Sequence, residues 1–172
     1  MPGIDLAILV LRVVLGLLFI GHGAQKLLGW FGGHGLEGTA KWFGELGLNP
    51  PRLWAVIAGL AELLGGVGLV LGLLTPIAAA AIIAVMLMAI AKVHWANGLW
   101  ITQNGLEYAL VNALVAAFIG FIGPGRYALD AFLRINYPMP TTFLIALVIA
   151  IIGILIALVS GRRLAQPQMR SA

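Results

Sequence analysis

Residues 6–28, LAILVLRVVLGLLFIGHGAQKLL, decide the fold of this chain. The stretch is apolar over a length that can cross a bilayer, which takes about 20 helical residues. It nevertheless carries Arg12, His22, Gln25 and Lys26. Because an ionisable group is costly inside a membrane, such residues are functional candidates. The sequence therefore predicts a membrane helix with a polar face.

The overall composition supports this interpretation. Of the 172 residues, 62% are hydrophobic and 9% are charged, whereas soluble domains are roughly 45–50% apolar and about 25% charged. These values exclude a soluble enzyme, a disordered chain and a fibrous repeat. The absence of cysteine excludes disulfides and thiolate metal sites. The net charge of +4 then indicates contact with anionic lipid rather than with nucleic acid.

Four further apolar segments follow, at 52–74, 77–93, 106–122 and 141–159. In the first connection, apolar residues recur at helical spacing over 36–46, which predicts a short interfacial amphipathic helix. We expect an all-α membrane protein: a four-helix transmembrane bundle with an additional C-terminal transmembrane helix. Its expected units are the bundle at 1–133, a connection and extra helix at 134–160, and a basic mobile tail at 161–172.

Five crossings would place the N-terminus and the connection 123–140 on one side of the membrane, here called side A. The connections 29–51 and 94–104 would lie on the other, side B. The tail arginines then favour side B in the cytoplasm by the positive-inside rule, in a multi-pass protein of the inner membrane. All five tryptophans fall in or beside the side-B connections: Trp30, Trp42, Trp54, Trp95 and Trp100. The sequence thus predicts an aromatic cap on side B.

Polar residues from the first four spans converge beneath this cap. The catalytic candidates are His22, Lys26 and Glu62, since Glu62 lies near the middle of the second span and His22 and Lys26 are neighbours one helical turn apart. A polar pocket that opens toward side B is the natural inference. The ligand-binding candidates are Arg12, Gln25, Trp30, His94, Glu107, Tyr108 and Asn112.

Each candidate also has a structural interpretation. Arg12 and Glu62 can form an ion pair that only locks two helices, and Lys26, Lys92 and Glu107 can extend to the interface from span ends. Asn112 is of the kind that bonds between helices. No metal-ligand spacing occurs, and haem ligation by His22 and His94 lacks any supporting motif. The small residues Ala61, Gly65, Gly68 and Gly72 predict close approach of another helix.

Several motifs resemble the DoxX family of small membrane proteins. They are GHGAQKLLGWFGG at 21–33, LEGTA at 36–40, AGLAELLGG at 58–66, Val93-His94, Asn97-Gly98, and GPGRYALD at 123–130. The resemblance covers about residues 6–131 and implies a four-helix membrane bundle. It also implies that Arg12, His22, Lys26, Glu62 and His94 occupy recurrent polar positions. Some members are named as subunits of a thiosulfate:quinone oxidoreductase, and others are linked to oxidative-stress defence beside soluble redox proteins.

The leading hypothesis is a redox-associated membrane subunit that binds a quinone-like amphiphile, with His22, Lys26 and Glu62 handling protons and Arg12 keeping the Glu62 carboxylate ionised. If it is an enzyme, the resemblance implies a quinone-linked oxidoreductase subunit. Electrons would come from a soluble redox partner or a second membrane subunit, and a homo-oligomer is compatible. Two alternatives stay open: a non-catalytic scaffold or assembly partner for soluble redox proteins, and a small-solute or proton carrier.

Overall fold

A computed structural model describes residues 2–162, and the secondary structure of this part is helical. Four segments are long and apolar enough to cross a membrane: Gly3–Leu28, Pro51–Leu71, Thr75–Asn97 and Thr141–Gly161. Nearly all of the tail predicted at 161–172 lies outside the described residues. The helices are α1 (Pro2–Leu28), α2 (Gly35–Glu45), α3 (Pro51–Leu71), α4 (Thr75–Ala89), α5 (Glu107–Ile122), α6 (Leu129–Phe132) and α7 (Thr141–Arg162).

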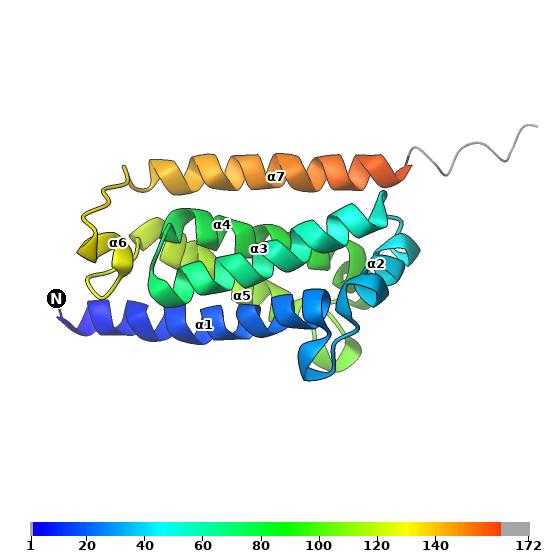
Figure 1. Ribbon diagram of the computed structural model, residues 1–172, viewed down its shortest axis with the longest axis horizontal. Coiled ribbons are helices and arrows are strands. Elements are labelled where there is room, and N and C mark those ends of the chain that lie inside the picture. Colours follow the sequence, from blue (N-terminus) through cyan, green and yellow to red (C-terminus); the bar gives the residue numbers. More distant parts are fainter. Residues whose placement is uncertain (1, 163–172) are drawn as a thin grey trace, which may run out of the picture.

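The helix ends follow from glycine and proline. Pro51 occupies the first turn of α3, where its missing N–H costs no hydrogen bond. At the other end, Gly72 takes a left-handed conformation with φ 66° and terminates α3. Only two residues then precede α4, so α3 and α4 form a tight antiparallel hairpin. This turn lies at the end of the helix group where α1 begins, the end that we expect on side A; the opposite end is the one expected on side B (Figure 1).

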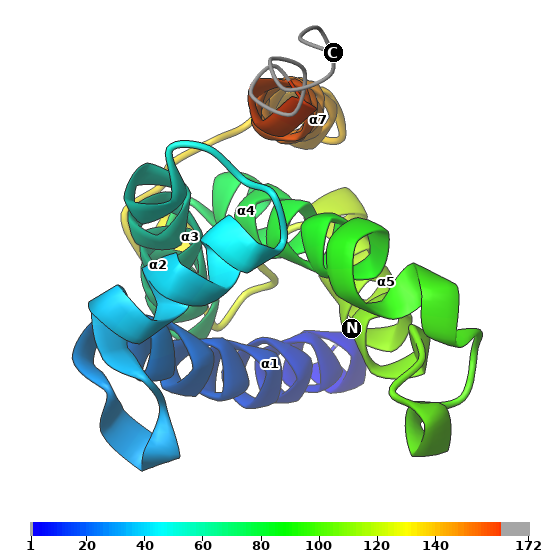
Figure 2. The same ribbon diagram turned by 90° about the vertical axis from the view of Figure 1, so that its right-hand side faces the viewer.

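α1, α3, α4 and α5 pack side by side, with α1 along α3 and α4 along α5 (Figures 1 and 2). α2 contacts both α1 and α3 and lies where α1 ends and α3 begins. α7 runs along the outside of this group and contacts chiefly α4. The main apolar core lies between the helices and includes Leu15, Phe19, Leu69, Ile82, Ile119 and Phe143.

α7 is held firmly at its two ends. At side A, the fully buried ring of Phe143 packs directly on Gly120 of α5 and lies 4.9 Å from the ring of Phe121. At side B, Ala157 is buried in a second apolar cluster that includes Phe43 and residues of α3. Between these two anchor points, the inner face of α7 lines a cavity.

α1 and α3 approach so closely that glycines are required where they meet. A Cβ atom added to Gly16 would lie 2.6 Å from the Gly66 carbonyl oxygen, and one added to Gly23 would lie 2.6 Å from the Leu63 nitrogen. The stripe expected from Ala61 to Gly72 also allows close approach, but toward α4, since Gly65 faces Ala78 and Ile82. Small residues on both faces of α3 therefore let it pack against two helices.

We expect Gly23→Ala to destabilise the protein by about 1–3 kcal/mol, because the methyl group would force the α3 backbone away. Gly21 is the matched control: it lies on the same helix, and a Cβ added there meets nothing within 4 Å. Gly21→Ala should be neutral or stabilising by up to about 1 kcal/mol. Thermal unfolding in detergent measures both, and equal midpoints for the two variants would contradict the close crossing.

Candidate functional site

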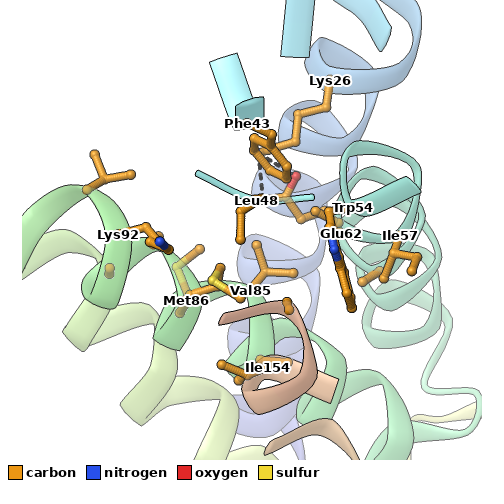
Figure 3. Close-up of a pocket in the computed structure, with 18 of the residues that line it drawn as sticks. Lys26, Phe43, Leu48, Trp54, Ile57, Glu62, Val85, Met86, Lys92 and Ile154 are labelled. Atoms are coloured by element: carbon orange, nitrogen blue, oxygen red, sulfur yellow. Dashed lines mark hydrogen bonds and ion pairs between the residues drawn. The ribbon is translucent and has the colours of Figure 1, made fainter. Parts of the chain in front are cut away.

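A cavity of about 480 Å³ lies near side B, between the helix group and α7 (Figure 3). Its volume falls within the usual range of small-molecule sites, about 300–1,000 Å³. α1, α2, α3, α4, α5 and α7 all contribute to its walls. Most of the lining is apolar, with Ile57, Val85, Met86, Met88 and Ile154 among its larger side chains. Six polar or ionisable side chains interrupt this surface: His22, Lys26, Glu62, Lys92, His94 and Tyr108.

An ion pair between α1 and α3 forms the centre of the polar lining. The Lys26 Nζ atom lies 2.6 Å from Glu62 Oε2 and 2.8 Å from Oε1, so it donates to both carboxylate oxygens. Glu62 is only 1% exposed. The glycines at 59 and 66 flank Glu62 on this face of α3, and both lie directly against α1. The close helix crossing therefore positions the ion pair.

His22 connects α1 to α5 beside this pair. Its Nε2 atom lies 3.0 Å from the Tyr108 hydroxyl, and its Nδ1 atom lies 3.2 Å from Gln25 Oε1. Gln25 donates through its amide nitrogen to the Phe31 carbonyl, which leaves its oxygen facing His22. An amide oxygen only accepts, so Nδ1 of neutral His22 carries the proton. Nε2 then accepts a hydrogen bond from the Tyr108 hydroxyl, which links α1 to α5.

Lys92 and His94 enter the cavity lining from a π-helical turn, η2 (Ile90–His94), which continues α4. Such turns inside α-helices are frequent at functional sites. The half-buried Lys92 donates to the Leu46 carbonyl oxygen at 2.9 Å. His94 Nδ1 lies 2.8 Å from the Asn104 carbonyl oxygen and donates to it. This turn therefore adds a cation and an imidazole to the side-B end of the cavity.

Arg12 lies elsewhere, and the expected pairing with Glu62 is wrong. The guanidinium is fully buried near side A, where it donates to the Leu69 carbonyl at 2.9 Å and the Tyr127 carbonyl at 2.6 Å. α1 and α3 run antiparallel, so Lys26 is level with Glu62, while Arg12 is level with Leu69. Arg12 is therefore separated from the Lys26 level by 14 residues of α1, roughly 21 Å.

Asp130 of α6 forms a second polar cluster around this end. Its carboxylate is fully buried and accepts hydrogen bonds from the Leu74 and Thr75 backbone nitrogens, the Thr75 hydroxyl and the Tyr137 hydroxyl. It also interacts electrostatically with Arg12. Burial, together with the negative charge of Asp130, raises the pKa of Tyr137, which keeps that hydroxyl protonated as a donor. These contacts fix α6 to the α3–α4 turn.

The other predicted ligand-binding residues do not line the cavity. Gln25 positions His22, and the Glu107 carboxylate accepts a hydrogen bond from the Ile101 backbone nitrogen. Asn112 is buried, and its amide nitrogen lacks a hydrogen-bond partner within residues 2–162. The Trp30 side chain is 59% exposed and contacts Phe31. Two tryptophans of the predicted cap, Trp42 and Trp54, line the cavity instead, while Trp95 and Trp100 are exposed.

Three sets of lining residues were missed by the interpretation of the sequence. Lys92 was not among the predicted site residues, because extension to the interface was an equally open interpretation, although its position near His94 was a signal for the same site. Phe43 and Leu48 belong to the first connection. Its amphipathic pattern predicted an apolar face but did not indicate that this face covers a cavity. The wall formed by α7 is apolar, and its small residues Ala150, Gly153 and Ala157 give no polar signal. In the described part of the chain, no group of three His, Asp or Glu side chains could hold a metal ion.

Comparison with known proteins gives one match. The family model described as DoxX matches residues 7–95, slightly more than half of the chain. The matched region includes His22, Lys26, Glu62, Lys92 and His94, whereas Tyr108 and α7 follow it. No curated protein and no solved structure matches the chain.

Proposed function

This chain belongs to the DoxX family of membrane proteins, and on that basis we propose that it binds a small quinone-like amphiphile in the side-B cavity. Its role is that of a redox-associated membrane subunit. The single observation that carries this proposal is the cavity itself, a mostly apolar chamber with an ion pair and a histidine–tyrosine hydrogen bond in its wall. Small-molecule sites typically combine a mostly apolar lining with a few polar groups that orient the ligand.

The proposed topology has α1, α3, α4 and α5 crossing the inner membrane as a bundle. α7 makes a fifth crossing on its outside, and α2 lies in the side-B interface, where its exposed Trp42 contacts lipid headgroups. α5 has 16 residues, roughly 24 Å of helix. A helix of this length spans a bilayer that thins locally around it. The basic tail favours side B as the cytoplasmic side.

The polar residues suit the chemistry of a quinone. Reduction of a quinone to a quinol adds two electrons and two protons, one proton at each oxygen. In the proposed reduction, the Tyr108 hydroxyl turns from His22 Nε2 to one quinone oxygen and gives it a proton, and Lys26 donates a hydrogen bond to the same oxygen through its third N–H. The second proton and the proton that restores Tyr108 come from water. Glu62 keeps Lys26 oriented. The electrons come from a partner protein, an assignment that rests on the family resemblance.

Titration with an alkyl naphthoquinone tests this function. Trp42 and Trp54 line the cavity, so a bound quinone should quench the tryptophan fluorescence of the purified protein in a saturable manner. We expect Gly153→Phe to weaken binding at least about tenfold, because nothing lies within 4 Å of a Cβ atom added there and the ring would fill the cavity. Val148→Phe is the control, since Val148 faces outward on the same helix.

Equal binding by the two variants would mean that the quinone binds outside the cavity. A linear, non-saturable quench of the unmodified protein would overturn the proposed function. In that case the Lys26–Glu62 pair, which joins α1 to α3, favours the scaffold alternative, in which the charges only lock helices together.

A further inference from the structure

Lys92 brings a positive charge to the lining of the cavity. Within residues 2–162, no carboxylate pairs with this charge. The acceptor of its Nζ atom there is the neutral Leu46 carbonyl oxygen, 2.9 Å away. An ammonium group has three donors, so two remain for another partner. A charge at the edge of a bilayer is costly unless water, lipid or a counter-ion balances it. Leu46 caps the C-terminal end of α2, whose partial negative charge balances the ammonium only in part. The two remaining donors of Lys92 are therefore available to an acceptor that carries negative charge.

The other ionic groups of the cavity do not meet this need. Lys26 and Glu62 neutralise each other through two hydrogen bonds. Figure 3 shows Lys92 on the opposite side of the cavity from Glu62, with Val85 and Met86 between them. His94 lines the cavity from the same turn and donates its Nδ1 proton to Asn104, which leaves its Nε2 atom as the free nitrogen of the neutral ring. Lys92 is therefore a cation of this lining that pairs with no carboxylate of residues 2–162.

The backbone holds this cation in place. The π-helical turn Ile90–His94 shifts the helix register just before the helix ends, so that Lys92 faces the cavity. The hydrogen bond to Leu46 connects it to the segment that follows α2, and it lies beside Gly47, where an added Cβ atom would be 4.0 Å from the ammonium. A fixed ammonium at the side-B end of an apolar chamber can recognise a charged head group.

We propose that Lys92 binds an acidic head group, so that the cavity selects anionic amphiphiles over neutral ones of the same size. This inference rests on the proposed function, because it assumes that an amphiphile occupies the cavity. The acidic group lies at the Lys92 end, and the apolar body extends along Met86 and Ile154. A ligand of suitable chemistry is a quinone with an acidic ring hydroxyl, or a long-chain carboxylate.

A matched pair of ligands tests this selection. The first is an alkyl hydroxynaphthoquinone, which is anionic at mildly alkaline pH, and the second is its neutral methyl ether with the same alkyl chain. Binding is measured by tryptophan quenching in a neutral detergent without lipid. We expect the unmodified protein to bind the anion roughly tenfold more tightly, as one charge-assisted hydrogen bond provides. Lys92→Gln should bind both compounds equally, whereas Lys92→Arg should keep the preference.

Lys41→Gln provides the control for net charge, because Lys41 is an exposed lysine on α2 outside the cavity lining. This variant should keep the full preference. Two results would overturn the inference: equal binding of both compounds by the unmodified protein, as expected if Lys92 only reaches lipid phosphate, or an undiminished preference in Lys92→Gln. If the unmodified protein bound neither compound, the proposed function itself would be overturned. Saturable binding of the neutral ether together with no anion preference refutes only the role of Lys92.

Discussion

Replacement of Lys26 by methionine is expected to lower the free energy of unfolding by about 3–5 kcal/mol, the usual cost of leaving one member of a buried ion pair alone. Glu62 is 1% exposed, so its carboxylate cannot turn to water when Lys26 is absent. The double variant Lys26→Met, Glu62→Leu should recover most of this loss, since it leaves no unpaired charge. Unfolding in detergent by a denaturant, followed by tryptophan fluorescence, measures all three proteins.

The pair between Arg52 and Glu37 is the matched control. Its atoms lie 3.0 Å apart, but the two side chains are 68% and 76% exposed. Arg52→Met should therefore cost less than about 1 kcal/mol. If Lys26→Met were as mild as Arg52→Met, the ion pair would not be a buried element of the fold. If the double variant were as unstable as the single one, the loss would come from packing rather than from charge.

Replacement of Asp130 by alanine is expected to cost about 3–5 kcal/mol, because several buried donors lose their acceptor at once and each such loss costs about 1–3 kcal/mol. The donors belong to Leu74, Thr75 and Tyr137, and Arg12 loses the neighbouring negative charge. Asp130→Asn should be intermediate, since its single amide oxygen can replace only part of the carboxylate. The thermal unfolding midpoint in detergent measures the series.

Glu45→Ala controls for the loss of a carboxylate, because Glu45 is exposed at the end of α2. It should change stability by no more than about 0.5 kcal/mol. Quinone binding by folded Asp130→Asn should equal that of the unmodified protein, since Asp130 lies outside the cavity lining. An Asp130→Ala variant as stable as Glu45→Ala would show that the carboxylate does not hold α6 to the α3–α4 turn.

The helices were predictable because hydropathy and helix-breaking residues are local signals. The expected segments 6–28, 52–74 and 106–122 agree with α1, α3 and α5 to within a few residues, and the segment 141–159 agrees with α7. The third segment was expected to end at 93, whereas helical turns continue to Asn97. The π-helical turn Ile90–His94 spans the expected end, and a 3₁₀ turn, η3 (Trp95–Asn97), follows it. Hydropathy does not describe such a change of helix type.

The candidate site was predictable in outline but not in its pairings. The polar residues of the first four spans, gathered beneath the tryptophan cap, predicted one site for His22, Lys26 and Glu62, and the structure brings these three side chains to one cavity. Counting from predicted span ends does not fix how far one helix is shifted along its axis relative to its neighbour. Arg12 was therefore matched with Glu62, although Lys26 is its partner. The cavity wall formed by α7 depends on tertiary packing of uniformly apolar residues, which no spacing in the sequence reveals.

The inner face of α7 bounds the cavity along one side. Its small residues Ala150, Gly153 and Ala157 recur at helical spacing along one face, between the anchor points at Phe143 and at Ala157 itself. Together they form one wall of the apolar chamber, while its polar groups come from α1, α3, α5 and the end of α4. For the proposed amphiphile, we expect substitutions on this face to change the preferred chain length without changing the preference for an acidic head group.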